Sequence, residues 1–227
     1  MNFRGLRDTV TFMQYYPIYL NVENRRCVIV GVGDVAERKV QRLLECGARV
    51  VVIGRTLTPA LEVMIKDGLI DWIEGDYDEA HLHDAFLVIG ATDREAVNAR
   101  ISEDARKKGI MVNIVDDPEK CDFILPSLFQ RGDLTVAIST GGKSPALAKK
   151  MREELEGLYG PEYLILLNLL GAIREKIKAR GTSPDDNKRL FEALVNSDIL
   201  QHIRENNWDR INTLVLDLTG EDIEAGK

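Results

Sequence analysis

The sequence predicts an α/β fold: a parallel sheet, then a small strand-rich segment, then a helical module. Three observations support this prediction. Short apolar runs alternate with helical patterns up to about residue 115, two strand-like runs joined by a short link follow, and the residues after 144 show helical spacing. Strands that alternate with helices are joined by right-handed crossovers, which produces a parallel sheet covered on both faces. We therefore expect regions at 1–115, 116–143 and 144–227, the last with a frayed C-terminus.

The first region alternates between buried strands and amphipathic helices. Gly47 and Gly109 follow two of the predicted helices, which is typical of a helix C-terminus. Thr58 precedes Pro59, and this pair predicts an N-cap with proline at the first helical position. In chain order, we expect strands at 27–30, 50–53, 70–74, 86–90 and 111–115, and helices at 35–46, 58–66 and 95–108.

The pattern changes in the second half of the chain. Runs at 123–130 and 134–140 have the character of strands, and the short link between them, Arg131–Asp133, contains a glycine and predicts a hairpin. Beyond this hairpin, glycine and proline separate stretches of helical spacing. The expected helices cover about 145–156, 162–179, and 185 to the region of Asn206.

Composition excludes several classes of protein. The chain has 227 residues and a net charge of −7, so it can bury a core without disulfides, and nonspecific binding to nucleic acid or to a membrane surface is disfavoured. Its three cysteines, Cys27, Cys46 and Cys121, lack the paired spacing of a metal site and indicate a reducing compartment. The start of the chain lacks a secretory h-region, and no run has the length of a transmembrane helix. We expect a cytoplasmic protein without a structural metal.

A glycine motif carries the strongest functional signal. GVGDVA, from Gly31 to Ala36, fits the GxGxxG/A fingerprint of a Rossmann-like dinucleotide-binding fold, and it lies between a predicted strand and a predicted helix. Gly31 permits the tight turn, Gly33 lets the backbone approach a pyrophosphate, and Ala36 lets the helix pack closely on the strand. Asp34 and Val35 open the helix, whose N-terminal N–H groups attract phosphate. A glycine turn without a ligand is the alternative, and the context favours the dinucleotide.

The acidic half of that fingerprint is missing. An acid normally ends the second strand and binds the ribose hydroxyls, but Arg55 follows this strand, and neither Asp nor Glu occurs between Glu45 and Glu62. Arg55 has the chemistry to bind a 2′-phosphate, which would favour NADP. It is equally compatible with a solvated loop, so the choice between NAD and NADP stays open.

Two more segments end strands at the same predicted edge of the sheet. Thr92 and Asp93 follow the fourth strand, and we expect Asp93 to cap the next helix, although a ligand contact is the alternative. Asp116 and Asp117 follow the fifth strand, just before Pro118. Paired acids at this place suit a general base, but Asp-Asp-Pro is also typical of a turn, and spacing alone favours the turn.

A hydroxyl- and glycine-rich link, STGGKSP, precedes the first helix of the C-terminal module. Its N–H groups could form an anion-binding nest to which Lys143 adds charge. The alternative is a flexible connection in which Ser144 caps the helix. The basic cluster of Lys149, Lys150 and Arg152 follows on that helix and is compatible with a solvated face or with an anionic substrate.

Four segments together resemble the sirohaem-synthase dehydrogenase/ferrochelatase family, over about residues 15–158: GVGDVAERKVQRLLECGARVVV, EGDYDEAHL, VIGATDREAVNARI and VNIVDDPEKCDFILPSLFQRGDLTVAISTGGKSPALAKKMREELE. The resemblance implies a Rossmann domain, a strand-rich dimerisation segment, a helical module and a homodimer. It also implies oxidation of the tetrapyrrole precorrin-2 to sirohydrochlorin with NAD⁺, followed in some members by insertion of Fe²⁺ to give sirohaem. Val32 stands where glycine is common in the family.

The resemblance also assigns roles to individual residues. Asp116 matches the aspartate that serves as the catalytic acid–base group, which reverses the preference for a plain turn. Thr140, with the adjacent Gly141, occupies a position that contacts the tetrapyrrole. Arg38, Lys143 and the Lys149–Lys150 pair become clamps for the carboxylates of the substrate.

A second hypothesis comes from another functional class. A non-catalytic domain that senses dinucleotides and regulates a partner would carry the same glycine motif. Such a sensor has no evident need for the DDP and STGGKSP segments, so we favour the enzyme.

Overall fold

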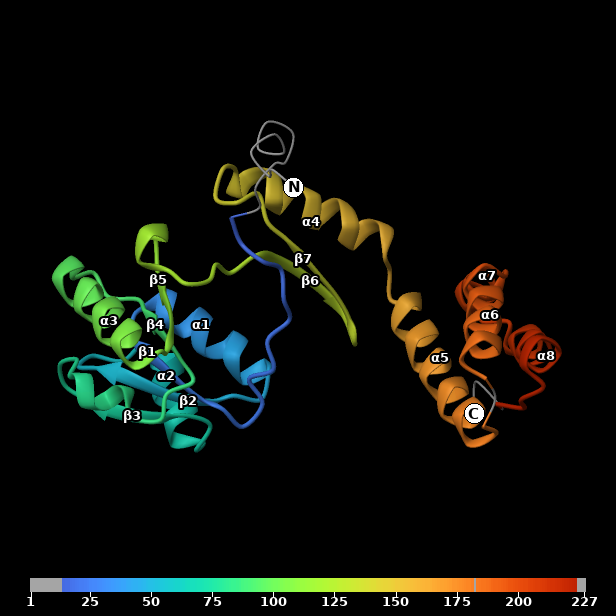
Figure 1. Cartoon of the computed structure of the whole chain (residues 1–227), viewed down its shortest axis with the longest axis horizontal. Helices are drawn as coiled ribbons and strands as arrows, with labels where there is room; N and C mark the ends of the chain where they lie inside the picture. The colour runs from blue at the N-terminus through green and yellow to red at the C-terminus, as the bar shows by residue number, and fades with distance from the viewer. Residues whose placement is uncertain (1–13, 182, 224–227) are drawn as a thin grey trace, which may run out of the picture. The chain divides into compact units, whose positions relative to one another are not determined.

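A computed structural model describes residues 14–181 and 183–223. The chain divides into two compact units, Met1–Leu125 and Pro126–Lys227, and each is described by itself (Figure 1). None of the helices within the described ranges is long and apolar enough to cross a membrane.

The first unit contains a five-stranded sheet, all of whose pairings are parallel. The strand order is β3-β2-β1-β4-β5, so the order reverses between β1 and β4, where sheets of this kind bind their ligands. This sheet confirms the predicted Rossmann-like fold. The elements are β1 (Arg26–Val30), α1 (Asp34–Glu45), β2 (Arg49–Gly54), α2 (Pro59–Lys66), β3 (Asp71–Glu74), η2 (Glu79–Leu82), β4 (Leu87–Gly90), α3 (Glu95–Lys108), β5 (Met111–Ile114) and η3 (Pro118–Lys120).

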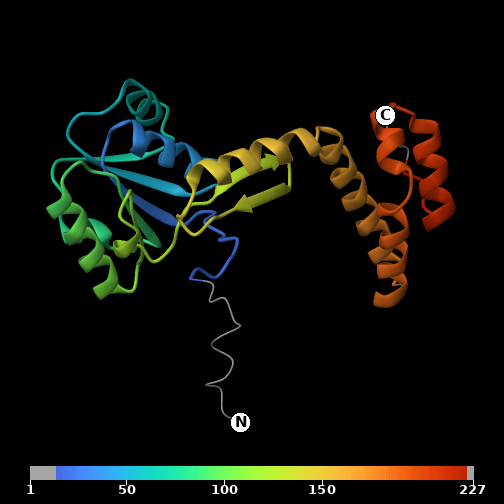
Figure 2. The same cartoon turned by 90° about the horizontal axis from the view of Figure 1, so that it is seen from above.

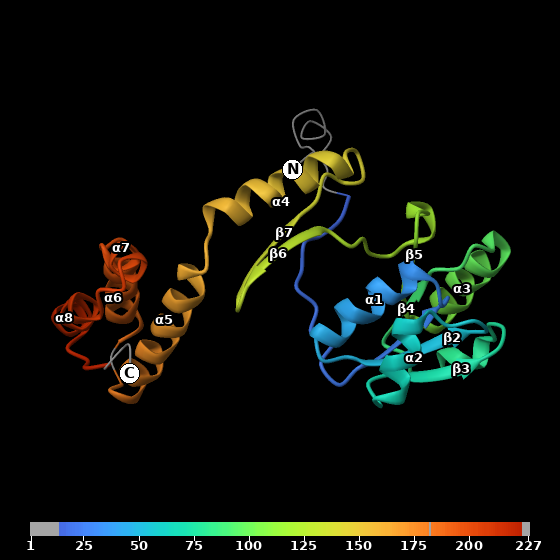
Figure 3. The same ribbon diagram turned by 180° about the vertical axis from the view of Figure 1, so that it is seen from behind.

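Alternating residues of β1 build two cores, one on each face of the sheet. Cys27 and Ile29 belong to the cluster under α1 and α2, whereas Val28 and Val30 belong to the cluster under α3. Both faces are apolar because helices cover both, as is usual for parallel sheets. Figure 3 shows α1 and α3 with the sheet between them.

Local signals set most helix ends in this unit. Thr58 caps α2 as predicted, since its Oγ1 accepts a hydrogen bond from the N–H of Leu61 at 3.2 Å. Gly109 ends α3 with a left-handed φ of 68°. The prediction that Asp93 caps α3 is wrong, because the N-cap is Arg94. The hydroxyl of Thr92 accepts the N–H of Arg94 at 3.2 Å, and this turn delays the helix by one residue.

The second unit begins with the predicted hairpin. β6 (Ser127–Arg131) pairs antiparallel with β7 (Leu134–Ile138), and the register runs from Ser127 opposite Ile138 to Arg131 opposite Leu134. The predicted first strand began too early. The carbonyl of Phe123 instead accepts a hydrogen bond from the Asn113 side chain at 2.9 Å, within the first unit. Pro126, which lacks an N–H, then separates the units.

Helix α4 (Pro145–Leu158) lies along this hairpin (Figure 2). Ser144 caps it, because its Oγ accepts a hydrogen bond from the N–H of Leu147 at 3.2 Å. The buried ring of Phe129 stacks on Tyr159, which meets Tyr163 edge to face. This aromatic column connects the hairpin to the following helix.

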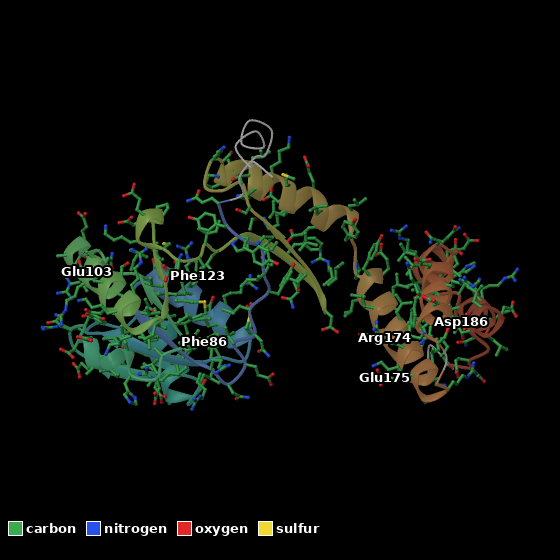
Figure 4. All side chains as sticks on the ribbon, in the orientation of Figure 1. Phe86, Glu103, Phe123, Arg174, Glu175 and Asp186 are labelled. Carbon is green, nitrogen blue, oxygen red and sulfur yellow. The ribbon has the colours of Figure 1, made fainter. Side chains whose placement is uncertain are left out.

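Four further helices form the rest of the unit: α5 (Glu162–Ala179), α6 (Pro184–Val195), α7 (Ile199–Arg204) and α8 (Trp208–Thr219). The predicted continuous helix from 185 to the region of Asn206 is wrong. Ser197 breaks it, donating a hydrogen bond to the carbonyl of Leu194 at 2.6 Å and accepting the N–H of Ile199 at 3.3 Å. The sequence also gave no expectation of α8. Figure 4 labels Arg174 and Glu175 on α5 and Asp186 on α6, whose apolar faces meet in a common core.

Candidate functional site

A cavity of about 780 Å³ opens at the carboxyl edge of the parallel sheet. Its walls come from the segments that follow four strands, β1, β2, β3 and β4. It therefore lies where the strand order reverses, which is the usual ligand site of this architecture. The lining segments are 30–33, 53–56, 75–77 and 91–94.

The turn after β1 requires glycine. Gly31 has a φ of 128°, and a Cβ placed on it would lie 2.4 Å from the carbonyl oxygen of Ala91. Gly33 is the N-cap of α1, is extended (φ −89°) and has no side chain to cap the helix. The first N–H groups of α1, those of Asp34, Val35 and Ala36, lack intrahelical partners by the geometry of a helix start. This turn fits a dinucleotide, because it offers free N–H groups and a positive helix end to a pyrophosphate.

A cluster of three charged residues lies on the wall made by the ends of β2, β3 and β4. Asp76 accepts a hydrogen bond from Arg55 at 2.5 Å on one carboxylate oxygen and from Arg94 at 3.0 Å on the other. These two hydrogen bonds hold the pKa of Asp76 below its ordinary value, and the bond from Arg55 has the larger effect. Sequence reasoning missed Asp76 and Arg94, although Asp76 lies two residues after the end of the predicted third strand.

Hydrogen bonds fix the backbone around this cluster. The indole N–H of Trp72 donates to the carbonyl of Gly54 at 2.9 Å, and the N–H of Gly75 donates to the same carbonyl at 3.3 Å. A Cβ on Gly54 would lie 2.5 Å from the side chain of Val32, so the turns after β1 and β2 are in close contact. The two turns therefore form one continuous wall.

The segment after β4 is braced by its own side chains. Thr92 donates its hydroxyl to the amide oxygen of Asn98 at 2.7 Å, and the amide nitrogen of Asn98 donates to the carbonyl of Thr92 at 2.9 Å. Asp93 lines the cavity and does not cap α3. The structure thus brings Thr92 and Asp93 to the same cavity as the glycine turn.

The two acids after β5 differ in their surroundings. Asp117 pairs with Lys120, and this hydrogen bond holds the pKa of Asp117 below its ordinary value. Asp116 is exposed and has a left-handed φ of 62°. Few residues other than glycine adopt this conformation, although aspartate does so more often than most. Such backbone outliers concentrate at functional sites.

Asp116 lies beside the basic face of α1. Burial lowers the pKa of Lys39, the neighbouring Arg38 lowers it further, and the charge of Asp116 opposes both. Arg38 itself is exposed on α1. Neither Asp116 nor Arg38 belongs to the cavity lining, but both occur in the same unit as the cavity.

The remaining predicted site residues belong to the second unit. Thr140 accepts the N–H of Lys143 at 3.1 Å through its carbonyl and the N–H of Ser144 at 3.1 Å through its hydroxyl. Gly141 and its neighbour Gly142 are left-handed, with φ of 60° and 80°. The loop is therefore an ordered turn before α4. Lys149 and Lys150 are exposed on α4 and pair weakly with acids one turn later.

Comparisons with known proteins agree with this arrangement. Residues 18–127 match a family model described as putative NAD(P)-binding, and residues 131–158 match one described as sirohaem biosynthesis protein central. Siroheme synthase 1 of Aeromonas salmonicida is 41% identical over 188 residues, which are 83% of this chain and 40% of that protein. Siroheme synthase 3 of Aeromonas hydrophila is 37% identical over 215 residues, 94% of this chain and 46% of that protein.

A solved structure shares the fold. "SirC, precorrin-2 dehydrogenase" matches with a TM-score of 0.76 and 23% identity, covering 91% of this chain and 100% of that one. The chain spans less than half the length of the two siroheme synthases that it matches.

Proposed function

Because the chain belongs to the sirohaem-synthase dehydrogenase/ferrochelatase family, we propose that it binds NAD⁺ and oxidises precorrin-2 to sirohydrochlorin. One observation carries this proposal: a tight turn that requires glycine at position 31 leads into the N-terminus of α1, at the edge of a large cavity. That turn suits the pyrophosphate of a dinucleotide. When bound, NAD⁺ supplies the acceptor for the hydride that leaves the tetrapyrrole.

In this proposal the chain's own residues hold the cofactor and move a proton. The N–H groups of Asp34, Val35 and Ala36 bind the pyrophosphate, with Gly31 and Gly33 allowing its approach. Thr92 and Asp93 border the same cavity. The oxidation releases one hydride and one proton from the macrocycle, so a base must take the proton.

Asp116 is our candidate for that base. Its carboxylate is exposed, follows β5 at the carboxyl edge of the sheet, and is held by an unusual backbone conformation. The neighbouring Asp117 is a weaker candidate, because Lys120 occupies it and lowers its pKa. A carboxylate with a low pKa is a poorer proton acceptor.

Substrate carboxylates require cations, and we propose that Arg38, Lys143, Lys149 and Lys150 supply them, with Thr140 and Gly141 positioning the macrocycle. The exposure of the four cationic side chains supports this role. We further propose a homodimer that pairs through the β6–β7 hairpin, because a two-stranded sheet is marginal by itself. We also propose that the same enzyme inserts Fe²⁺. A cytoplasmic location completes the proposal and is supported by the three free thiols.

The test is a dehydrogenase assay with a matched pair of variants. Protein mixed with precorrin-2 and NAD⁺ should produce NADH, detected by its absorbance at 340 nm, at a rate that falls roughly in the range of ordinary enzyme turnover. Asp116→Asn should reduce turnover roughly 100-fold or more, because it removes a general base and keeps a side chain that tolerates φ of 62°. Asp117→Asn, which alters the adjacent carboxylate, should keep turnover within about threefold.

Three results would count against the proposal. Absence of NADH from the wild-type protein would remove the dehydrogenase assignment. Equal losses in Asp116→Asn and Asp117→Asn would remove the specific role of Asp116. Failure of the wild-type protein to accelerate a spectral change of sirohydrochlorin with Fe²⁺ or Co²⁺ would remove the chelatase step alone.

A further inference from the structure

The end of β2 lacks the acid that normally binds the adenosine ribose, and the structure places another carboxylate nearby. Gly54, the last residue of β2, pairs with Glu74, the last residue of β3. Residues that follow these strands therefore leave the sheet side by side. Asp76, from the turn after β3, reaches Arg55, from the turn after β2, at 2.5 Å.

Both oxygens of this carboxylate are engaged. Arg55 donates to Oδ2 of Asp76, and Arg94, which precedes α3, donates to Oδ1 at 3.0 Å. The side chains of Arg55, Asp76 and Arg94 are 70%, 50% and 55% exposed, so these pairs contribute little to the stability of the fold. All three nevertheless line the cavity of the glycine turn. Their arrangement therefore matters more for a bound ligand than for folding.

We propose that Asp76 makes this site select NAD⁺ over NADP⁺ by occupying Arg55 and by repelling a 2′-phosphate. This inference rests on the cofactor role in the proposed function. In this fold the ribose of the adenosine half lies at the end of the second strand, which is where Arg55 begins its turn. A ribose hydroxyl can donate to the carboxylate of Asp76, whereas a phosphate cannot.

A 2′-phosphate meets two obstacles here. It carries close to two negative charges, and each would repel the single charge of Asp76. It would also need the guanidinium of Arg55, which Asp76 already holds. Two unit charges about 4 Å apart in water change a binding constant about fivefold, so the presence of Asp76 beside Arg55 and Arg94 should weaken binding of a nearly divalent phosphate roughly tenfold or more relative to the same site without that carboxylate.

The test measures binding to the full chain without any substrate. Isothermal titration calorimetry gives Kd for NAD⁺ and for NADP⁺ with the wild-type protein, Asp76→Asn and the double variant Arg55→Ala/Asp76→Asn. Asp71→Asn is the matched control, because it removes a carboxylate from the opposite end of β3. Circular dichroism melts establish that each variant is folded.

We expect the wild-type protein to bind NAD⁺ at least about tenfold more tightly than NADP⁺. Asp76→Asn should tighten NADP⁺ binding roughly tenfold, since it removes the repulsion and frees Arg55, and it should change the Kd for NAD⁺ much less. The double variant should lose most of that gain, because the phosphate then lacks Arg55, the cation at the end of β2, and keeps only Arg94. Asp71→Asn should leave the ratio of the two constants unchanged.

The outcomes separate this inference from the function beneath it. A wild-type protein that binds neither dinucleotide overturns the cofactor role and the inference with it. A wild-type protein that binds NAD⁺, but whose preference is unchanged in Asp76→Asn, overturns the inference alone. A wild-type preference for NADP⁺ also overturns it, as does a gain in Asp76→Asn that survives the loss of Arg55.

Discussion

Replacement of Gly33 by alanine should separate folding from cofactor binding. Of the described residues, none lies within 4 Å of the place that a Cβ on Gly33 would take, and its φ of −89° suits any residue. A compatible Gly→Ala change stabilises a protein by about 0.4–1 kcal/mol through the unfolded state. Alanine is a poorer N-cap than glycine by roughly some tenths of a kcal/mol, so this loss nearly cancels the gain from the unfolded state.

Cofactor binding should respond quite differently. The new methyl group occupies the space through which the pyrophosphate approaches the N–H groups of α1. A hydrogen bond to a charged group contributes about 1.5–3 kcal/mol, so losing one weakens NAD⁺ binding roughly 10- to 150-fold. Urea unfolding measures the stability of the variant, and calorimetry measures its Kd for NAD⁺.

Gly31→Ala provides the contrast. Its φ of 128° and the 2.4 Å approach to Ala91 should destabilise the protein by more than about 2 kcal/mol. Gly68→Ala controls for backbone strain without a clash, because Gly68 has a φ of 70° and open space around its Cβ position among the described residues. Unaltered NAD⁺ affinity in Gly33→Ala, or a loss of stability as large as in Gly31→Ala, would refute the reasoning.

Two further predictions concern stability. Because Lys120 lowers the pKa of Asp117, the pair stabilises the protein above the ordinary aspartate pKa, and this contribution disappears as the pH falls through the lowered value. Urea unfolding of wild type and Asp117→Asn should therefore differ at neutral pH and converge once the pH lies below the lowered pKa of Asp117; a constant difference would contradict the assignment. Ile173→Ala should cost about 2–5 kcal/mol in the core of the helical module, where Ile173 is 0% exposed. Leu216→Ala, at a half-exposed position, should cost about 0.5 kcal/mol, and equal midpoints for the two variants would show that Ile173 is not a core residue.

The sequence predicted features that depend on neighbouring residues. Apolar runs of four or five residues marked most of the parallel strands, and the GVGDVA segment marked the turn because its chemistry lies within six residues. Thr58 and Gly109 were correctly predicted as helix ends for the same reason. These signals lie within a few residues of one another, so they can be recognised in the sequence without knowledge of the fold.

The sequence missed contacts between distant residues, and it also missed local turns in which a hydroxyl could satisfy the backbone in more than one way. The contact between Arg55 and Asp76 joins positions 21 residues apart and requires the pairing of β2 with β3. The end of α6 depends on Ser197, a residue whose hydroxyl can satisfy the backbone in either a helix or a turn. The start of α3 falls at Arg94 and not at Asp93, because the hydroxyl of Thr92 accepts the N–H of Arg94, and only the geometry of this turn decides it.

The contact between Val32 and Gly54 constrains how this protein can change over evolutionary time. A methyl group at position 54 would lie 2.5 Å from the isopropyl group of Val32, so Val32 would have to move before position 54 could carry a side chain. If position 32 first becomes glycine, the space is released and position 54 can acquire a side chain. The two positions are thus epistatic, because the substitution at position 32 has to precede the one at position 54. We expect the side-chain volumes at these two positions to vary inversely among homologues.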